Sequence, residues 1–127
     1  MDILLVDDNA DYLELLKEIL AENGYTVHTA RDGMEGCDVL TRTDIDLIIS
    51  DIRMPGLDGL KLHAFARELE RYRKTKFIFI SAYTDLARNT LKLDPVMDYL
   101  LDKTTPVKRI LKLVDELIFG RIEGAWS

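Results

Sequence analysis

The segment Leu47-Ile48-Ile49-Ser50-Asp51 predicts a buried strand that ends in a carboxylate. It is apolar on both faces, as expected for a central strand of a parallel sheet that helices cover on both sides. Two more runs have the same form, because Ile3-Leu4-Leu5-Val6 leads to Asp7-Asp8 and Tyr99-Leu100-Leu101 leads toward Lys103. Charged side chains therefore follow three separate predicted strands.

These charged residues are expected to converge in the folded chain. In a parallel α/β sheet the carboxyl ends of the strands share one edge, and ligands bind in the crevice there. Asp7, Asp8 and Asp51 would then lie together, with Lys103 beside them. Three carboxylates repel one another unless a cation lies among them. The pattern thus predicts a hard divalent metal ion next to an anion site, which suggests phosphate chemistry on an aspartate.

The composition is that of one globular domain. The chain has 127 residues, of which 47% are hydrophobic and 31% charged, a length and balance typical of a single packed core. The formal net charge of −6 argues against a nucleic-acid-binding surface on this domain. Because Cys37 is the only cysteine, the sequence excludes an intrachain disulfide and a cysteine-based zinc site.

Membrane and export signals are missing from the sequence. No apolar run approaches the roughly 20 residues that span a bilayer. The start, Met1-Asp2-Ile3, lacks the positively charged region of a signal peptide. We therefore expect a cytoplasmic protein that does not bind membranes.

Strand-like apolar runs alternate with helix-period stretches along the whole chain. We expect strands at 2–7, 25–30, 47–51, 77–80 and 97–101, and helices at 10–23, 33–41, 59–72, 85–95 and 106–119. Asn9 and Asp32 are expected to cap the first two helices. The alternation predicts an α/β fold with a doubly wound parallel sheet. We expect one domain over 1–119, followed by a tail or linker over 120–127.

The segment Asp51 to Gly59, with the sequence DIRMPGLDG, resembles the phosphoacceptor segment of response-regulator receiver domains. The other motifs fit the same family. Val6-Asp7-Asp8-Asn9 resembles its metal-binding acidic pair, Ser81-Ala82 its conserved hydroxyl followed by a small residue, and Lys103 its invariant lysine. The separations between these motifs are also usual in that family. The resemblance covers about residues 2–119 and implies a CheY-like fold, with five strands in the order 2-1-3-4-5 and five helices.

The resemblance implies a phosphoacceptor role for Asp51, which would receive a phosphoryl group from a histidine of a partner kinase. It implies Mg²⁺, or alternatively Mn²⁺, bound by Asp8, Asp51, the main-chain carbonyl of Arg53 and waters. Asp7 would act mostly through water. Mg²⁺ readily accepts a site that keeps several waters and few carboxylates, and it offsets charge on a phosphoryl group in transfer. On this basis the domain is a phosphoacceptor with slow aspartyl-phosphate hydrolysis, and not an enzyme in the ordinary sense.

Further positions take their roles from the same resemblance. Lys103 would contact phosphate oxygens as a point charge, and Ser81 would hydrogen-bond the phosphoryl group. Arg53 and Tyr83 would flank that group and tune its hydrolysis. Ser81 and an aromatic in the fifth strand, for which Tyr99 is the candidate, would form the switch. The expected partners are a sensor histidine kinase or phosphotransfer protein, and an effector or second copy bound through the surface of the fourth helix, fifth strand and last helix.

The sequence departs from the family pattern after the fifth strand. The string Lys103-Thr104-Thr105-Pro106 replaces the usual Lys-Pro, so a trans Lys103-Thr104 peptide is expected, because a non-prolyl cis bond costs about 2.5–4 kcal/mol. The switch aromatic normally lies three residues before the lysine, where Leu100 stands, whereas Tyr99 lies four before. A bulge at Leu101-Asp102 would restore Tyr99 to its place, whereas without a bulge Leu100 takes the switch position. In another alternative, Asp102 occupies the lysine's position.

Three other functions are consistent with parts of this pattern. A pseudo-receiver that binds partners without phosphorylation would be expected to lack one of the acids, and all are present. A haloacid-dehalogenase-like phosphatase carries an acid two residues after its nucleophile, where this chain has Arg53. A flavin- or nucleotide-binding domain needs a phosphate-cradling loop after the first strand, where Asp7-Asp8 would repel phosphate. Phosphorylation-dependent signalling fits best.

Overall fold

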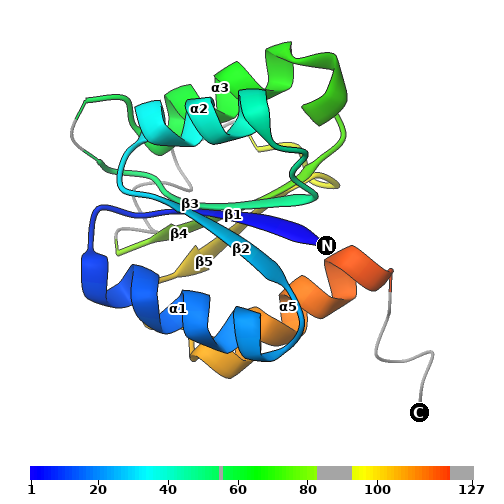
Figure 1. Cartoon of the computed structure of the whole chain (residues 1–127). Helices are drawn as coiled ribbons and strands as arrows, with labels where there is room; N and C mark the ends of the chain where they lie inside the picture. Colours follow the sequence, from blue (N-terminus) through cyan, green and yellow to red (C-terminus); the bar gives the residue numbers. More distant parts are fainter. Residues whose placement is uncertain (55, 83–92, 121–127) are drawn as a thin grey trace.

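The computed structural model describes residues 1–54, 56–82 and 93–120 (Figure 1). Five parallel strands form one sheet in the order β2-β1-β3-β4-β5. The strands are β1 Asp2–Val6, β2 Thr26–Ala30, β3 Leu47–Asp51, β4 Lys76–Ser81 and β5 Asp98–Asp102. The α-helices are α1 Ala10–Glu22, α2 Gly33–Arg42, α3 Gly59–Glu68 and α5 Val107–Phe119, with a 3-10 helix η1 at Glu70–Tyr72.

The predicted doubly wound parallel sheet and its strand order are confirmed. The described residues contain four α-helices where five were expected. The missing one, predicted at 85–95, falls largely on residues 83–92, which lie outside the described part of the chain. The third helix was predicted too long. It ends at Glu68 because Leu69 has an extended backbone, and a 3-10 turn continues to Tyr72.

Helices cover both faces of the sheet and divide the core into two halves. In Figure 1, α2 and α3 lie on one side and α1 and α5 on the other. Alternate residues of β1 enter different halves, because successive strand side chains point to opposite faces. Leu4 and Val6 pack in the α2–α3 half, whereas Ile3 and Leu5 pack in the α1–α5 half. Full burial of β1 and β3 explains why both are continuous apolar runs.

Each of the first three helices begins with a side-chain cap close to the carboxyl edge of the sheet. The Asn9 side chain accepts from the Tyr12 N–H, Asp32 from the Glu35 N–H, and Asp58 from the Lys61 N–H. These bonds satisfy N–H groups that have no partner within the helix. They also fix where the loops after β1, β2 and β3 turn back; Asp7 and Asp8 lie on the first of these loops and Arg53 on the third.

The fifth strand pairs with β4 in an unbroken register from Phe77–Asp98 to Ser81–Asp102. The bulge that would have restored Tyr99 to the switch position is therefore absent. Regular alternation places Tyr99 in the α1–α5 half of the core and Leu100 in the α2–α3 half. Leu100 thus stands on the face where the aromatic was expected.

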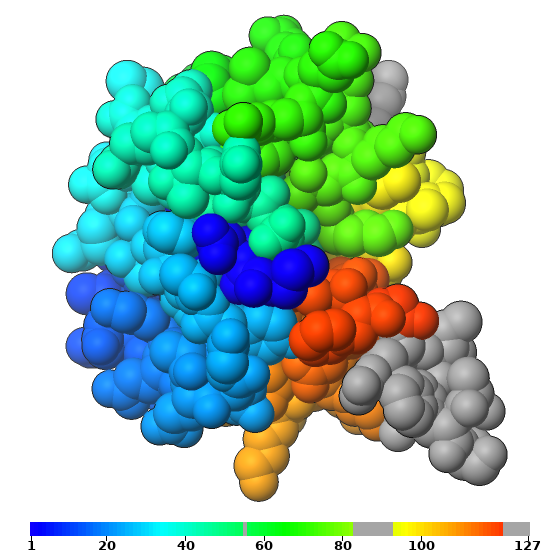
Figure 2. Space-filling view, turned by 45° about the vertical axis from the view of Figure 1, so that its right-hand side comes forward, coloured from blue at the N-terminus to red at the C-terminus, as the bar shows by residue number. Residues whose placement is uncertain are grey.

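The amino edge of the sheet is closed over the first strand. The Asp2 N–H donates to the Asp46 carboxylate at 2.7 Å, and the Asp46 N–H donates to the Asp2 carbonyl at 2.8 Å. In the space-filling view the start of the chain lies at the surface, between the segment leading into β3 and the end of α5 (Figure 2). None of the helices in the described ranges is long and apolar enough to cross a membrane.

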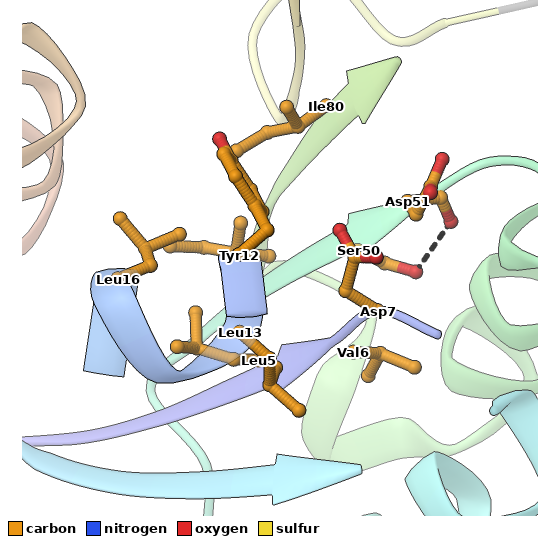
Figure 3. Close-up of a pocket in the computed structure, with 10 residues that line it drawn as sticks. Leu5, Val6, Asp7, Tyr12, Leu13, Leu16, Ser50, Asp51 and Ile80 are labelled. Atoms are coloured by element: carbon orange, nitrogen blue, oxygen red, sulfur yellow. Dashed lines mark hydrogen bonds between the residues drawn. The ribbon is translucent and has the colours of Figure 1, made fainter. Parts of the chain in front are cut away.

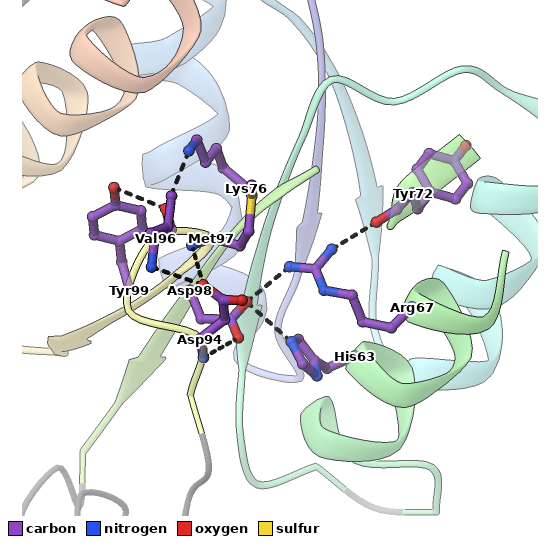
Figure 4. A network of polar contacts seen from close by, with 9 residues as sticks. All are labelled: His63, Arg67, Tyr72, Lys76, Asp94, Val96, Met97, Asp98 and Tyr99. Carbon is purple, nitrogen blue, oxygen red and sulfur yellow. Dashed lines mark hydrogen bonds and ion pairs between the residues drawn. The ribbon is translucent and has the colours of Figure 1, made fainter. Parts of the chain in front are cut away.

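A buried carboxylate at the start of β5 ties α3 to the sheet (Figure 4). The Asp98 side chain is 1% exposed and lies 2.8 Å from Arg67 Nη2 and 3.0 Å from His63 Nε2. It also accepts from the Asp94 N–H at 2.9 Å, and Arg67 donates onward to the Tyr72 carbonyl at 2.6 Å. A buried charge needs partners of this kind, because an unpaired one is costly.

Removing Arg67 should destabilise the fold much more than removing a surface ion pair. Breaking a buried pair typically costs about 3–5 kcal/mol. Because His63 remains as a second partner, we expect Arg67→Met to lower the free energy of unfolding by about 2–4 kcal/mol in urea denaturation. The control is Asp44→Asn, which breaks the pair between Arg71 and Asp44, side chains 51% and 83% exposed, and should cost less than about 1 kcal/mol.

A second substitution identifies the cause of that loss. If the unpaired Asp98 charge is responsible, adding Asp98→Asn to Arg67→Met should recover part of the stability, because the amide keeps hydrogen-bonding capacity without the charge. An equal or larger loss in the double variant would contradict this account and point to lost packing.

Candidate functional site

Three strand ends bring the predicted site residues together at the carboxyl edge. Asp7 directly follows β1, Asp51 ends β3, and Lys103 directly follows β5. Lys103 Nζ lies 3.0 Å from Asp51 Oδ2 and 3.1 Å from Asp7 Oδ2. These residues are 52 and 96 positions from Lys103 in the sequence, so the contacts depend wholly on the sheet topology. Figure 3 shows Asp7 and Asp51 side by side at the ends of their strands.

The carboxylates form a cluster of the kind that holds a metal ion. One oxygen each from Asp7, Asp8 and Asp51 lies within 4.8 Å of the others. Asp7 and Asp51 are buried, whereas Asp8 is exposed at the rim. Carboxylate oxygens are the ligands that hard cations such as Mg²⁺ prefer. The donor set therefore fits the predicted magnesium ion, with Asp8 on the solvent side.

The pKa values of Asp7 and Lys103 reflect the crowding of buried carboxylates in this cluster. Burial raises the pKa of Asp7, and the neighbouring Asp51 charge acts in the same direction, although hydrogen bonds from Asn9 and Lys103 offset part of this. Burial by itself would lower the pKa of Lys103, but its hydrogen bonds to Asp51 and Asp7 outweigh burial and raise it. Lys103 is thus firmly protonated, while Asp7 carries its charge at a cost that a cation would relieve.

The backbone around Asp51 is held closely. The Ser50 hydroxyl donates to the Asp51 carbonyl at 2.8 Å, and the Arg53 N–H donates to Asp51 Oδ1 at 3.3 Å. Gly59 lies against this segment, with its N–H 2.9 Å from the Ile52 carbonyl. A Cβ at Gly59 would lie 2.1 Å from the Asp51 carbonyl oxygen, so only glycine allows this approach. Sequence reasoning assigned Gly59 to the motif without recognising this steric role.

The remaining predicted residues are placed as follows. Ser81 is buried at the end of β4, and its carbonyl accepts from the Lys103 N–H at 3.0 Å. Arg53 is exposed two residues after the end of β3, and Tyr83 lies outside the described residues. The Asp102 carboxylate accepts from the Thr104 N–H at 2.8 Å, so Lys103 and not Asp102 reaches the acids. The Lys103–Thr104 peptide is trans, as predicted.

Tyr12 is part of this site and was missed from the sequence. Its ring centroid lies 5.1 Å from Lys103 Nζ, and its side chain lines a small cavity with Asp7, Ser50 and Asp51. Burial and the nearby carboxylate charges raise the pKa of Tyr12 to about 12. Helical periodicity alone made Tyr12 a flanking core residue of α1. The sequence signal that could have identified Tyr12 is an aromatic residue one helical turn after the acidic pair.

Comparison with known proteins agrees with the fold and shows the family. The profile of the response regulator receiver domain family matches residues 3–115. The transcriptional regulatory protein GlrR of Escherichia coli is 46% identical over 68 residues, which cover 54% of this chain and 15% of GlrR. The sensor histidine kinase RcsC of Escherichia coli is 41% identical over 69 residues, which cover 54% of this chain and 7% of RcsC.

A solved structure adds the whole-domain comparison. The response regulator TrrA of Thermotoga maritima, solved in complex with Mg²⁺ and BeF, is 34% identical with a TM-score of 0.79. The match covers 91% of this chain and 97% of that one. The chain belongs to the response regulator receiver domain family, whose members are phosphoacceptor domains of two-component signalling and bind Mg²⁺ at an acidic site. It spans only a small part of GlrR and RcsC, in which the domain is joined to further sequence.

The raised pKa of Asp7 has a consequence for stability. Because folding raises this pKa above its ordinary value of 3.8, the folded chain holds the proton to higher pH than the unfolded chain. Asp7 therefore costs no stability well below pH 3.8, and its full cost appears above the raised pKa. Asn at this position still accepts from the Asn9 N–H and carries no charge to bury.

We expect Asp7→Asn to raise the Tm of the metal-free protein by a few degrees at neutral pH, with the gain shrinking as pH falls toward about 4. Thermal unfolding followed by circular dichroism in EDTA, from pH 4 to 8, measures this. Asp38→Asn, at an exposed position of α2, is the control and should show no such trend. A variant less stable than the parent throughout the pH range would mean that the Lys103 contact outweighs the burial cost.

Proposed function

We propose that this chain accepts a phosphoryl group on Asp51 from a histidine of a sensor kinase or phosphotransfer protein, with Mg²⁺ bound at the acidic cluster. The observation that carries the proposal is the convergence of three carboxylates within 4.8 Å with an ammonium 3.0 Å from Asp51. The pairing provides a nucleophile, a cation site and a phosphate partner in one place. A pseudo-receiver needs none of these contacts, so that alternative is not favoured.

In this proposal a carboxylate oxygen of Asp51 attacks phosphorus as the phosphorus–nitrogen bond of the phosphohistidine breaks, and the imidazole nitrogen keeps the electron pair. Asp51 is buried but lies at the carboxyl edge of the sheet, and the hydrogen bond from the Arg53 N–H helps to orient its side chain. Lys103, already 3.0 Å from Asp51, remains beside the new phosphoryl oxygens. The Ser81 hydroxyl supplies a further hydrogen bond.

Asp8, Asp51 and the main-chain carbonyl of Arg53 would hold Mg²⁺ directly, and Asp7 through water. When bound, the ion neutralises charge on the phosphoryl group in transfer. The exposure of Asp8 agrees with a metal that keeps several waters. The exposed Arg53 is proposed to shield the aspartyl phosphate together with Tyr83, which keeps self-hydrolysis slow.

The output is proposed to pass through the surface of the fourth helix, β5 and α5 to an effector domain, an effector protein or a second copy of the chain; the predicted fourth helix lies largely outside the described residues. Matches to parts of a transcriptional regulator and of a sensor kinase support kinase and effector partners in general. A cytoplasmic location, as in the sequence-based expectation, fits this role and stays a prediction.

Acetyl phosphate with Mg²⁺ should add one phosphoryl group to the parent protein, and Asp51→Asn should abolish the addition because the amide is not a nucleophile. Intact-protein mass spectrometry measures the product. Asp38→Asn on α2 is the control and should be labelled like the parent. Full labelling of the Asp51 variant would move the phosphoacceptor elsewhere in the chain.

Magnesium affinity should separate the two neighbouring acids. We expect Asp8→Ala to weaken Mg²⁺ binding by more than about a hundredfold, because it removes a direct ligand, and Asp7→Asn by about tenfold, as is typical of an outer-shell partner. Isothermal titration calorimetry at constant ionic strength measures both against the Asp38→Asn control. Binding unchanged in both acid variants would remove the metal from this cluster.

The unbroken register of β5 changes the proposed switch residue from Tyr99 to Leu100. Leu100 packs in the α2–α3 half of the core, whereas the Tyr99 hydroxyl lies 3.4 Å from the Val96 carbonyl near the start of the strand. A leucine switch changes packing without moving a hydroxyl between solvent and interior. Shifting a domain from 1% to 99% active requires phosphorylation to favour the active state by about 5.5 kcal/mol. The transfer of a tyrosine hydroxyl from solvent to the interior does not contribute to that free energy in this domain.

We expect Leu100→Ala to reduce the effect of phosphorylation on dimerisation or partner binding, and Tyr99→Ala to leave it largely intact. Analytical ultracentrifugation with and without a phosphodonor compares the two variants, with labelling checked by mass spectrometry in each. Loss of the effect in the Tyr99 variant alone would return the switch role to the tyrosine.

A further inference from the structure

The side chain of Tyr12 occupies an unusual position between α1 and the acidic edge. Tyr12 is the third residue of α1 and lines the same cavity as Asp7, Ser50 and Asp51 (Figure 3). In that view it extends from the helix toward Ile80, across the strand ends. Its ring centroid lies 5.1 Å from Lys103 Nζ, within the distance at which an aromatic face attracts a cation.

Neither the helix nor the core explains a tyrosine here. The helix cap uses the Tyr12 backbone N–H, which donates to the Asn9 side chain at 3.1 Å and would do so with any side chain. The Tyr12 hydroxyl is buried, with no hydrogen-bond partner among the residues that the structure describes. A buried hydroxyl without a partner is destabilising. An aliphatic side chain would fill the space without that cost. The presence of an aromatic ring at this position therefore needs another explanation.

Lys103 provides that explanation, because the Tyr12 ring is the third group beside its ammonium. Its side chain is a flexible four-carbon stem, and its ammonium meets Asp51 at 3.0 Å and Asp7 at 3.1 Å. When Asp51 becomes an acyl phosphate, its carboxylate charge is lost and the phosphoryl group carries negative charge beyond it. In the proposed function Lys103 stays beside Asp51 and meets the new phosphoryl oxygens there. An aromatic face attracts the ammonium before and after the transfer, since its attraction does not depend on the state of Asp51.

We propose that Tyr12 is a positioning residue for Lys103, and that its ring holds the ammonium beside Asp51, where it meets the incoming phosphoryl group. The proposal rests on the proposed roles of Asp51 and Lys103. It predicts that the ring matters and the hydroxyl does not. Tyr12→Phe keeps the ring, whereas Tyr12→Leu and Tyr12→Met keep apolar bulk without an aromatic face.

The first test needs no phosphorylation. In metal-free protein with isotope-labelled lysine, NMR signals of the Lys103 side-chain methylenes should show a ring-current shift, assigned by their loss in Lys103→Ala. The shift should persist in Tyr12→Phe and disappear in Tyr12→Leu and Tyr12→Met. A shift that persists without the ring would overturn the contact. Two apolar variants are used so that one remains if the other fails to fold.

The second test is a double-mutant cycle on the rate of labelling by acetyl phosphate with Mg²⁺. We expect Tyr12→Leu to slow labelling by about two- to thirtyfold, the range that corresponds to a cation–π contact of about 0.5–2 kcal/mol. Tyr12→Phe should stay within about twofold of the parent. In a Lys103→Ala background, Tyr12→Leu should have no further effect.

An equal loss of labelling rate with and without Lys103 would show a structural role and overturn the proposal. If the parent itself is not labelled, the proposed function fails, while the NMR result still decides whether the contact exists.

Discussion

The pairing of one ammonium with two buried carboxylates at the carboxyl edge governs how this domain works. Lys103 lies within 3.1 Å of both Asp7 and Asp51, and the exposed Asp8 adds a third negative charge nearby. The Lys103 ammonium does not balance the three carboxylates, so the cluster keeps a net negative charge. Burial makes that imbalance costly. A divalent cation would relieve that cost. In the proposed function, the phosphoryl group then enters a site that already carries positive charge from the ion and Lys103.

The rest of the fold keeps these groups in place. Parallel strands with helical crossovers bring their carboxyl ends to one edge, so residues far apart in sequence meet. Close backbone packing then fixes the loops between strand and helix. A Cβ at Gly59 would lie 2.1 Å from the Asp51 carbonyl oxygen, and one at Gly33 would lie 2.2 Å from the Leu57 carbonyl oxygen. Because neither glycine has a side chain, both allow this close backbone packing around the segment that contains Asp51.

The same residue types serve a different purpose near the opposite edge. Asp98 is as deeply buried as any acid in the site, yet Arg67, His63 and a backbone N–H surround it. Its charge is balanced by groups of the chain, so no external cation is needed, and it joins α3 to β5. The balance of charge around Asp98 therefore differs from that around the site acids. Asp7 and Asp51 share the Lys103 ammonium, and Tyr12 lines the same cavity as both.

The sequence by itself determined the fold class and the acidic cluster, and its resemblance to receiver domains supplied the strand order. The hydrophobic periodicity, caps such as Asn9, and charged residues at strand ends are local signals, and the carboxyl ends of parallel strands share one edge. Only the tertiary structure decided the register of β5, which puts Leu100 where Tyr99 was expected, because a one-residue slip cannot be seen in an apolar run. It also decided that Lys103 reaches the acids and that Tyr12 faces it. Those contacts depend on side-chain directions across three separate elements, which local sequence does not carry.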